Sequence, residues 1–153
     1  MEPVILTRPP LALVGLQIRT VPMSPEIPAL WPRFVARLGE IGQAAEPGVT
    51  WGWMRVPPDD AQALLYLAAA QVSAGADVPE GMTGIEVPAA EVAVFEFPFT
   101  EIGKAYEFAF RTWLPASGLE QADGPLLERY GADFEPDDSS SPMQLHIPVR
   151  PRA

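Results

Sequence analysis

The sequence has no cysteine, and its 153 residues include a single histidine, His146. The missing cysteines exclude disulfides, thiol nucleophiles and cysteine-ligated metals, and a single histidine excludes histidine-rich metal sites and most Ser–His–Asp triads. There is no glycine-rich phosphate loop and no Gly-x-Ser-x-Gly nucleophile elbow. We therefore expect no metal and no other cofactor, and we expect His146 to be structural.

Basic side chains are also scarce. Ten Lys and Arg stand against 20 Asp and Glu, which gives a formal net charge of −10. Phosphate binding needs clustered Lys and Arg, so we expect no direct contact with nucleic acid and no binding to anionic membranes. A negative field favours cationic ligands, although an acidic surface can also serve solubility alone.

Long apolar runs are absent as well. No run approaches the roughly 20 residues that span a bilayer, and the first residues lack the pattern of a secretory signal. These features predict a cytoplasmic protein. With 48% hydrophobic residues the chain can bury a core, and its length is that of one domain. We expect a single domain over residues 1–153, with its first strand near residue 11 and no DNA-binding domain.

Proline, in contrast, is frequent: the 19 prolines predict many short elements with sharp ends. Ser24, Pro25 and Glu26 form a helix-start signal before an apolar stripe that ends at Gly42. Pro32 lies inside this pattern, and we expect it to delay the start of the helix. Strands are expected over 11–21, 49–56, 64–72, 83–97 (bent or broken at Pro88), 125–131 and 143–149, with a second helix over 100–114.

The order is strand, helix, strand, strand, and then the same again. We therefore predict an α+β domain of two βαββ halves, about 11–75 and 83–150, with two helices on one side of a curved antiparallel sheet. A cleft between two such halves is a natural ligand site.

Several stretches carry a resemblance to a known family. They are residues 15–19 (GLQIR), 27–34 (IPALWPRF), 87–95 (VPAAEVAVF), 113–118 (WLPASG), 127–130 (LERY) and 147–149 (IPV). Their order and spacing resemble the GyrI-like small-molecule-binding domain, the effector-binding module of AraC-type and MerR-type multidrug regulators, which also occurs as a free-standing protein. The resemblance covers almost the whole chain.

The resemblance implies two βαββ repeats related by a pseudo-twofold axis, with a pocket between them. In the family, a glutamate on the penultimate strand, in a Glu-x-Tyr setting, lies at the pocket floor and meets cationic aromatic ligands; Glu128 occupies that position here. Two departures concern the rim. Glu91 stands where the family often has an aromatic residue, and residues 98–100 (PFT) stand where a glycine usually follows the strand.

Glu128 is the main candidate site residue. Side chains alternate along a strand, so Glu128 and Tyr130 share one face. If that face lines an apolar pocket, burial raises the pKa of the carboxyl, and an aromatic cation would relieve the cost. The alternative is an ordinary surface glutamate on an edge strand, which the local sequence favours and the resemblance disfavours.

Aromatic side chains supply candidate walls for the pocket. We predict ligand contacts for Trp51, Trp53, Tyr66, Phe95 and Phe110, in addition to Tyr130. Trp51 and Trp53 are the strongest candidates, because both lie on one face of a strand beside a hairpin. The alternative for each aromatic is ordinary core, and we expect this for Trp113.

Three functions follow. The first is a binding module that captures amphipathic, cationic or aromatic small molecules, as a monomer or a homodimer. The second is hydrolysis of strained cyclopropane-bearing electrophiles, which the resemblance allows, with Glu128 as general base and a tyrosine hydroxyl assisting. The third is a protein–protein role of the gyrase-inhibitor type, which only the net charge supports.

Overall fold

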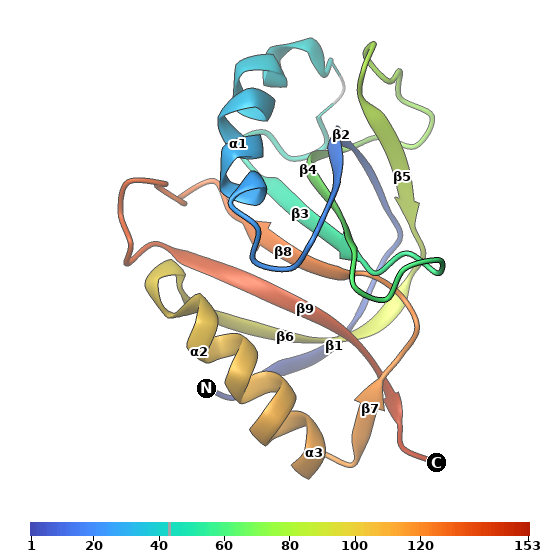
Figure 1. The fold of residues 1–153 in the computed structure, drawn as a ribbon, viewed down its shortest axis with the longest axis vertical. Coiled ribbons are helices and arrows are strands. Elements are labelled where there is room, and N and C mark those ends of the chain that lie inside the picture. Colours follow the sequence, from blue (N-terminus) through green and yellow to red (C-terminus); the bar gives the residue numbers. More distant parts are fainter. Residues whose placement is uncertain (43) are drawn as a thin grey trace.

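The computed structural model describes residues 1–42 and 44–153. In this part of the chain, nine strands pair antiparallel into a curved sheet, and the helices lie along one side of it (Figure 1). The strands are β1 (Val4–Arg8), β2 (Leu11–Thr20), β3 (Thr50–Arg55), β4 (Leu64–Val72), β5 (Thr83–Val87), β6 (Ala90–Pro98), β7 (Leu119–Gln121), β8 (Leu126–Tyr130) and β9 (Pro142–Pro151). The predicted α+β architecture is confirmed.

The sheet consists of two similar halves that meet at β3 and β8. Its strand order is β1-β6-β9-β8-β3-β4-β2-β5, so β6-β9-β8 on one side matches β2-β4-β3 on the other, and β1 and β5 form the two edges. Strand β7 pairs with β9 outside this path. This order is that of two βαββ repeats related by a pseudo-twofold axis, with the axis between β3 and β8.

Two strand predictions need correction. The first strand does not begin near residue 11, because β1 precedes β2 and pairs with β6 at the sheet edge. The single bent or broken strand expected over 83–97 is two separate strands at opposite ends of the sheet: β5 pairs with β2, whereas β6 lies between β1 and β9. Pro88 lies between them and has no N–H for a ladder, so the chain changes direction there.

The first helix also differs from its prediction. Helix α1 (Glu26–Arg37) begins directly after Pro25 and includes Pro32, which therefore does not delay its start. The hydroxyl of Ser24 accepts the Glu26 N–H at 3.1 Å and stabilises this start. Burial of the apolar face of α1 offsets the hydrogen bond that Pro32 cannot donate. A 3₁₀ turn, η1 (Leu38–Glu40), follows, so the helical segment ends before Gly42.

The second helical segment forms where the sequence predicts it. This α2 segment consists of η2 (Phe99–Glu101), α2 (Ile102–Glu107), the π-helical η3 (Phe108–Trp113) and α3 (Leu114–Ala116). None of the helices in the described part of the chain combines the length and the apolar character that a membrane crossing requires.

Both faces of the sheet are buried over much of its area. On the helix side, α1 packs over Tyr66 of β4, and the α2 segment packs over Phe95 of β6. On the other side, a separate apolar cluster contains Trp51, Trp53 and Leu127. Since side chains alternate along a strand, Gly52 and Glu128 face the helices while their neighbours face away.

Candidate ligand cavity

A cavity of about 1760 Å³ lies between α1 and the α2 segment, over the central strands β3 and β8. It therefore occupies the cleft that the two-half architecture predicts. Its aromatic lining comes from Trp31, Tyr66, Phe99, Tyr106, Tyr130 and Phe134, and its prolines are Pro22, Pro25, Pro28, Pro32, Pro58 and Pro136. Among the described lining residues, only Arg55, Asp123 and Glu128 are charged.

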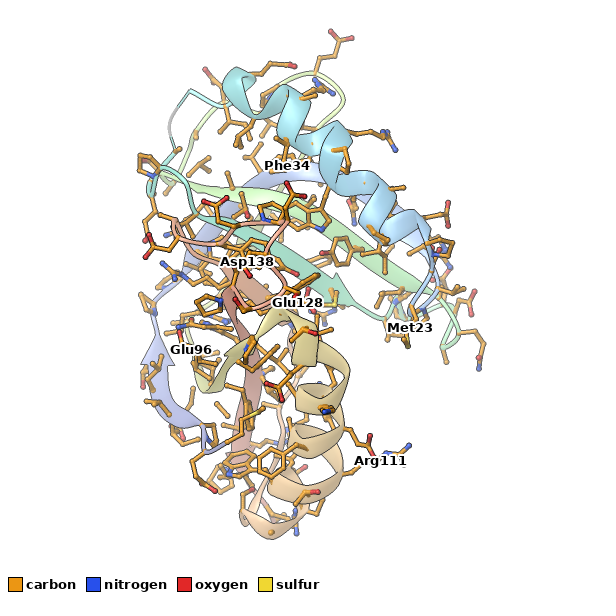
Figure 2. The ribbon with its side chains drawn as sticks, turned by 90° about the vertical axis from the view of Figure 1, so that its left-hand side faces the viewer. Met23, Phe34, Glu96, Arg111, Glu128 and Asp138 are labelled. Atoms are coloured by element: carbon orange, nitrogen blue, oxygen red, sulfur yellow. The ribbon has the colours of Figure 1, made fainter. Side chains whose placement is uncertain are left out.

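Glu128 lies on the floor of this cavity, between the two helices (Figure 2). Its side chain is buried, with the residue 6% exposed. The Tyr106 hydroxyl donates to Oε2 at 2.5 Å, and the Tyr130 hydroxyl donates to Oε1 at 2.8 Å. Burial raises the pKa of Glu128, and the two tyrosine hydrogen bonds reduce this rise because they favour the ionised form.

The carboxylate of Glu128 has hydroxyl partners only. No Lys or Arg in residues 1–42 and 44–153 forms an ion pair with it. Arg55, the single cationic residue of the described lining, instead pairs with Asp123 at 3.4 Å, and both of these side chains are solvent-exposed. An ionised Glu128 is therefore a buried charge without a counterion, which is an expensive arrangement.

A third hydrogen bond connects α1 to the cavity floor. The indole N–H of Trp31 donates to the Tyr66 hydroxyl at 3.0 Å, and the Trp31 ring meets Tyr130 edge to face at 5.4 Å. Burial, together with the charge of Glu128, raises the pKa of Tyr66, so its hydroxyl stays protonated. The same two causes raise the pKa values of Tyr106 and Tyr130, which therefore remain donors to Glu128.

Gly52 provides the space that this arrangement needs. It pairs directly with Glu128 across β3 and β8. A Cβ atom built on Gly52 would lie 2.6 Å from the Tyr66 hydroxyl oxygen and 3.3 Å from Oε1 of Glu128. Any side chain at this position would have to displace the polar groups of the floor.

The structure brings together some of the residues predicted to contact ligand. Glu128, Tyr130 and Tyr66 line the cavity. Trp51 and Trp53 do not, because they point to the opposite face of β3 and pack in the cluster there. The prediction that Trp51 and Trp53 contact ligand therefore needs correction. Trp31 and Tyr106 line the cavity instead.

The two predicted phenylalanines also lie outside the described lining. Phe95 is fully buried beneath the α2 segment, where it contacts Phe108 and Trp113 edge to face. Phe110 stacks on the Tyr106 ring at 6.3 Å and supports that ring without lining the cavity. Trp113 is packed against the core, in line with the sequence analysis.

Sequence reasoning missed Trp31, Tyr106 and Gly52. Tyr106 lies on the apolar stripe of the second helix, and Trp31 lies between two helical prolines, so each had a visible signal. Gly52 separates two tryptophans in β3; once those are assigned to one face, the missing side chain must leave a gap on the other.

His146 lies on the opposite face of the sheet from Glu128. Its Nδ1 lies 3.4 Å from the Arg8 guanidinium and its Nε2 lies 3.0 Å from the Gln144 side-chain oxygen. Burial, assisted by Arg8 and Arg129, lowers the pKa of His146 to about 3. The ring is therefore neutral at physiological pH, and it takes no part in the chemistry of the cavity.

An aromatic cavity with a buried carboxylate on its floor, between two βαββ halves, defines a small-molecule-binding domain. Comparison with known proteins agrees with this class. The family model described as the GyrI-like small molecule binding domain matches residues 1–150, and the chain belongs to this family.

Individual proteins are also similar to this chain. It is 32% identical to the transcriptional regulator BrlR of Pseudomonas aeruginosa over 148 residues, which is 95% of this chain and 54% of BrlR. The chain thus spans about half the length of this curated relative. The structure of SAV2435 bound to tetraphenylphosphonium matches with a TM-score of 0.79 and 16% identity, covering 98% of this chain and 94% of that one. A hydrolase from Listeria innocua has a TM-score of 0.56 and 13% identity, with 97% and 92% covered. At these identities the two structures show the fold alone.

Proposed function

We propose that this protein captures amphipathic aromatic cations in the cavity between its two halves, with Glu128 as their counterion. The observation that carries this proposal is the buried carboxylate of Glu128, which has two tyrosine donors but no cationic side chain of the described residues beside it. A cation on the cavity floor would supply the missing positive charge.

The walls favour the same class of ligand. Aromatic faces attract cations within about 6 Å of the ring centroid, by roughly 0.5–2 kcal/mol each. Trp31, Tyr66 and Tyr106 surround the floor, and six of the lining residues are prolines, which have no backbone N–H to donate. A diffuse, aromatic-rich cation suits this lining better than a small, strongly hydrated one, because it loses less hydration on entry.

Two relatives support this proposal. SAV2435 is bound to tetraphenylphosphonium, a lipophilic aromatic cation, and BrlR is a transcriptional regulator. We infer that the present domain either sequesters its ligand or presents the ligand-bound state to a partner. We propose that the domain makes no direct contact with nucleic acid and acts as a monomer or a homodimer.

The test is a titration with tetraphenylphosphonium, measured by calorimetry and by tryptophan fluorescence. We expect micromolar binding by the wild type and at least about a tenfold loss in Glu128→Gln, which corresponds to about 1.4 kcal/mol. Triphenylphosphine oxide, which is aromatic but neutral, is the ligand control, and we expect it to bind both proteins alike.

Glu96→Gln is the matched protein control, because Glu96 is an exposed glutamate on β6 that does not line the cavity. This variant should bind tetraphenylphosphonium as the wild type does. If wild type and Glu128→Gln bind tetraphenylphosphonium equally, or neither binds it, Glu128 is not the counterion and the proposal fails.

The second candidate is hydrolysis of strained cyclopropane-bearing electrophiles. It is favoured by the same cluster, since a carboxyl whose pKa is raised beside tyrosine hydroxyls can act as a general base. Both carboxylate oxygens already accept a tyrosine hydrogen bond, so water would have to use the remaining lone pairs, and we place binding first. Turnover of such an electrophile, followed by mass spectrometry and abolished in Glu128→Gln, would reverse this order.

A further inference from the structure

The rim of the cavity carries an unusual methionine. Met23 lies in the turn between β2 and α1, it lines the cavity, and it is 96% exposed. Its backbone has φ 63°, and it is the single non-glycine residue of the described chain with a positive φ. Residues other than Gly, Asn and Asp rarely adopt this backbone conformation, because their Cβ atom crowds the neighbouring backbone.

The neighbours of Met23 hold the turn in this form. Pro22 precedes it with a fixed φ, and the Ser24 N–H donates to the Val21 carbonyl across the turn at 3.2 Å. Glycine or asparagine would be the usual residue at such a position. A long apolar side chain is therefore held in water at a site where the local backbone does not favour it. Strain of this kind, when observed, points to function.

Met23 belongs to an apolar rim. Val35 of α1 and Val56, just after β3, also line the cavity and are exposed. Figure 2 shows Met23 beside the N-terminal end of α1, well away from Glu128 on the floor. The floor of the cavity thus carries a hydrogen-bonded carboxylate, and its rim carries apolar side chains that are exposed to solvent.

We propose that Met23 folds over the bound ligand and selects for cations whose apolar groups extend from the floor to the rim. This inference rests on the proposed function, and it adds the specificity-determining residue. A methionine suits the task because its unbranched, polarizable side chain adapts to ligands of different shape. Closure would bury the Met23 side chain against the apolar groups of the ligand that reach the rim, while the positive charge stays on the side of Glu128.

Methionine oxidation tests the closure directly. Dilute hydrogen peroxide converts exposed methionine to the sulfoxide, and peptide mass spectrometry reports the rate at each position. Met143, 1% exposed, should resist, whereas Met23 and the 47% exposed Met1 should react quickly. Saturating tetraphenylphosphonium should slow the oxidation of Met23 by about fivefold or more and leave Met1 unchanged. At a ligand concentration only a few times the wild-type Kd, where a tenfold loss of affinity leaves most sites empty, Glu128→Gln should lose most of this protection.

Replacing Met23 by glycine separates the loss of its ligand contact from the relief of its backbone strain. Glycine adopts φ 63° freely, so Met23→Gly should keep or raise the unfolding temperature. It should nevertheless bind tetraphenylphosphonium about threefold or more weakly, and bind the smaller phenyltrimethylammonium unchanged. Val21→Ala is the matched control, since Val21 is an exposed apolar residue of the same loop that does not line the cavity.

The outcomes are distinct from those of the proposed function. If tetraphenylphosphonium binds in a Glu128-dependent way but Met23 is not protected, and Met23→Gly binds both cations as the wild type does, Met23 has no role and the counterion proposal stands. If the wild type does not bind tetraphenylphosphonium at all, both proposals are overturned.

Discussion

The two halves of the molecule share one topology but contribute differently to the cavity. Gly52 and Glu128 pair directly at the centre of β3 and β8, so the pseudo-twofold axis relates these two positions to each other. A twofold axis between these two positions relates Met54, two residues after Gly52, to Tyr130, two residues after Glu128. The second half supplies the carboxylate and both of its hydrogen-bond donors, Tyr106 and Tyr130, whereas the first half has no side chain at Gly52 and a thioether at Met54.

This difference shows how a symmetric scaffold can hold a single charge. If both positions carried glutamate, two carboxylates would face each other on a dry floor, and one would have to stay protonated. Glycine on one side leaves room for the carboxylate of the other side and for the Tyr66 hydroxyl. The helices are divided in the same way: α2 contributes Tyr106, which contacts Glu128, and α1 contributes Trp31, which does not.

Of the substitutions that we predict, Gly52→Ala should have the largest effect on stability and on ligand affinity. In Gly52→Ala the new Cβ would lie 2.6 Å from the Tyr66 hydroxyl oxygen, so the floor must move. We expect a loss of about 1–3 kcal/mol in the free energy of unfolding, as for other overpacked sites. Affinity for tetraphenylphosphonium should fall by about tenfold or more, because Glu128 and Tyr66 are displaced together.

Chemical denaturation and calorimetric titration measure the two effects of Gly52→Ala. Gly39→Ala is the control, since a Cβ at Gly39 would meet nothing within 4 Å. Equal stability and affinity in the two alanine variants would mean that the floor has more free space than the structure shows.

The pH dependence of the free energy of unfolding should show that ionised Glu128 destabilises the folded protein. The folded-state pKa of Glu128 is raised, so between the unfolded value near 4.5 and the raised value the folded protein binds more protons than the unfolded chain. The contribution of Glu128 to the free energy of unfolding is therefore fully present below about pH 4.5 and is lost as the pH rises through the folded pKa.

Glu128→Gln removes this titration. The unfolding temperature of the variant minus that of the wild type should therefore increase as pH rises from about 4.5 to 8. Taking the difference cancels other titrating groups, including His146, whose lowered pKa is shared by both proteins. A difference that stays constant over this range would show that Glu128 titrates normally and is not desolvated.

The two helices should respond unequally to the loss of one hydrogen bond each. Tyr106→Phe removes a donor from the Glu128 carboxylate, and hydrogen bonds to charged groups are the stronger kind. We expect the pKa of Glu128 to rise further and cation affinity at pH 7 to fall by about three- to tenfold. Trp31→Phe keeps an aromatic wall and loses only its bond to the Tyr66 hydroxyl, so the loss should be about threefold or less.

Titrations at pH 6, 7 and 8 check this difference, because the deficit of Tyr106→Phe should shrink as the pH rises and a larger fraction of Glu128 ionises in both proteins. Trp51→Phe serves as a control from the opposite face and should bind as the wild type does. An equal deficit in Tyr106→Phe and Trp31→Phe at every pH would show that the tyrosine bond does not control ionisation.

Much of this fold could be predicted from the sequence, because alternation and helical stripes are local signals. The order of two βαββ halves and the shared face of Glu128 and Tyr130 both follow from such patterns. Strand β1 was missed since it is an edge strand with Val4, Ile5 and Leu6 all exposed, so it has no alternation to detect.

The side of the sheet that the helices cover could not be predicted in this way. Alternation shows that Trp51 and Trp53 share a face, but only the packing of α1 and α2 decides which face becomes the cavity. The role of Gly52 could not be predicted for a related reason. The space that Gly52 leaves is filled by Tyr66 and Glu128, which belong to other strands.

The smallest effect is expected at the exposed rim, where the two halves also meet. Arg55 at the end of β3 pairs with Asp123 in the β7–β8 loop at 3.4 Å, and both side chains are solvent-exposed. Exposed pairs contribute about 0–1 kcal/mol and are screened by salt. Asp123→Asn should therefore weaken tetraphenylphosphonium binding by about twofold or less at low ionic strength, and not measurably in about 0.5 M NaCl.

The floor should behave differently under the same change of salt, because a buried carboxylate is screened far less than an exposed one. Titrations of both variants at low and high salt therefore compare the two carboxylates of the lining directly: the deficit of Glu128→Gln should persist at high salt, whereas that of Asp123→Asn should vanish. If both deficits vanished together, the cation would be attracted by the overall charge of −10 and not held at the floor.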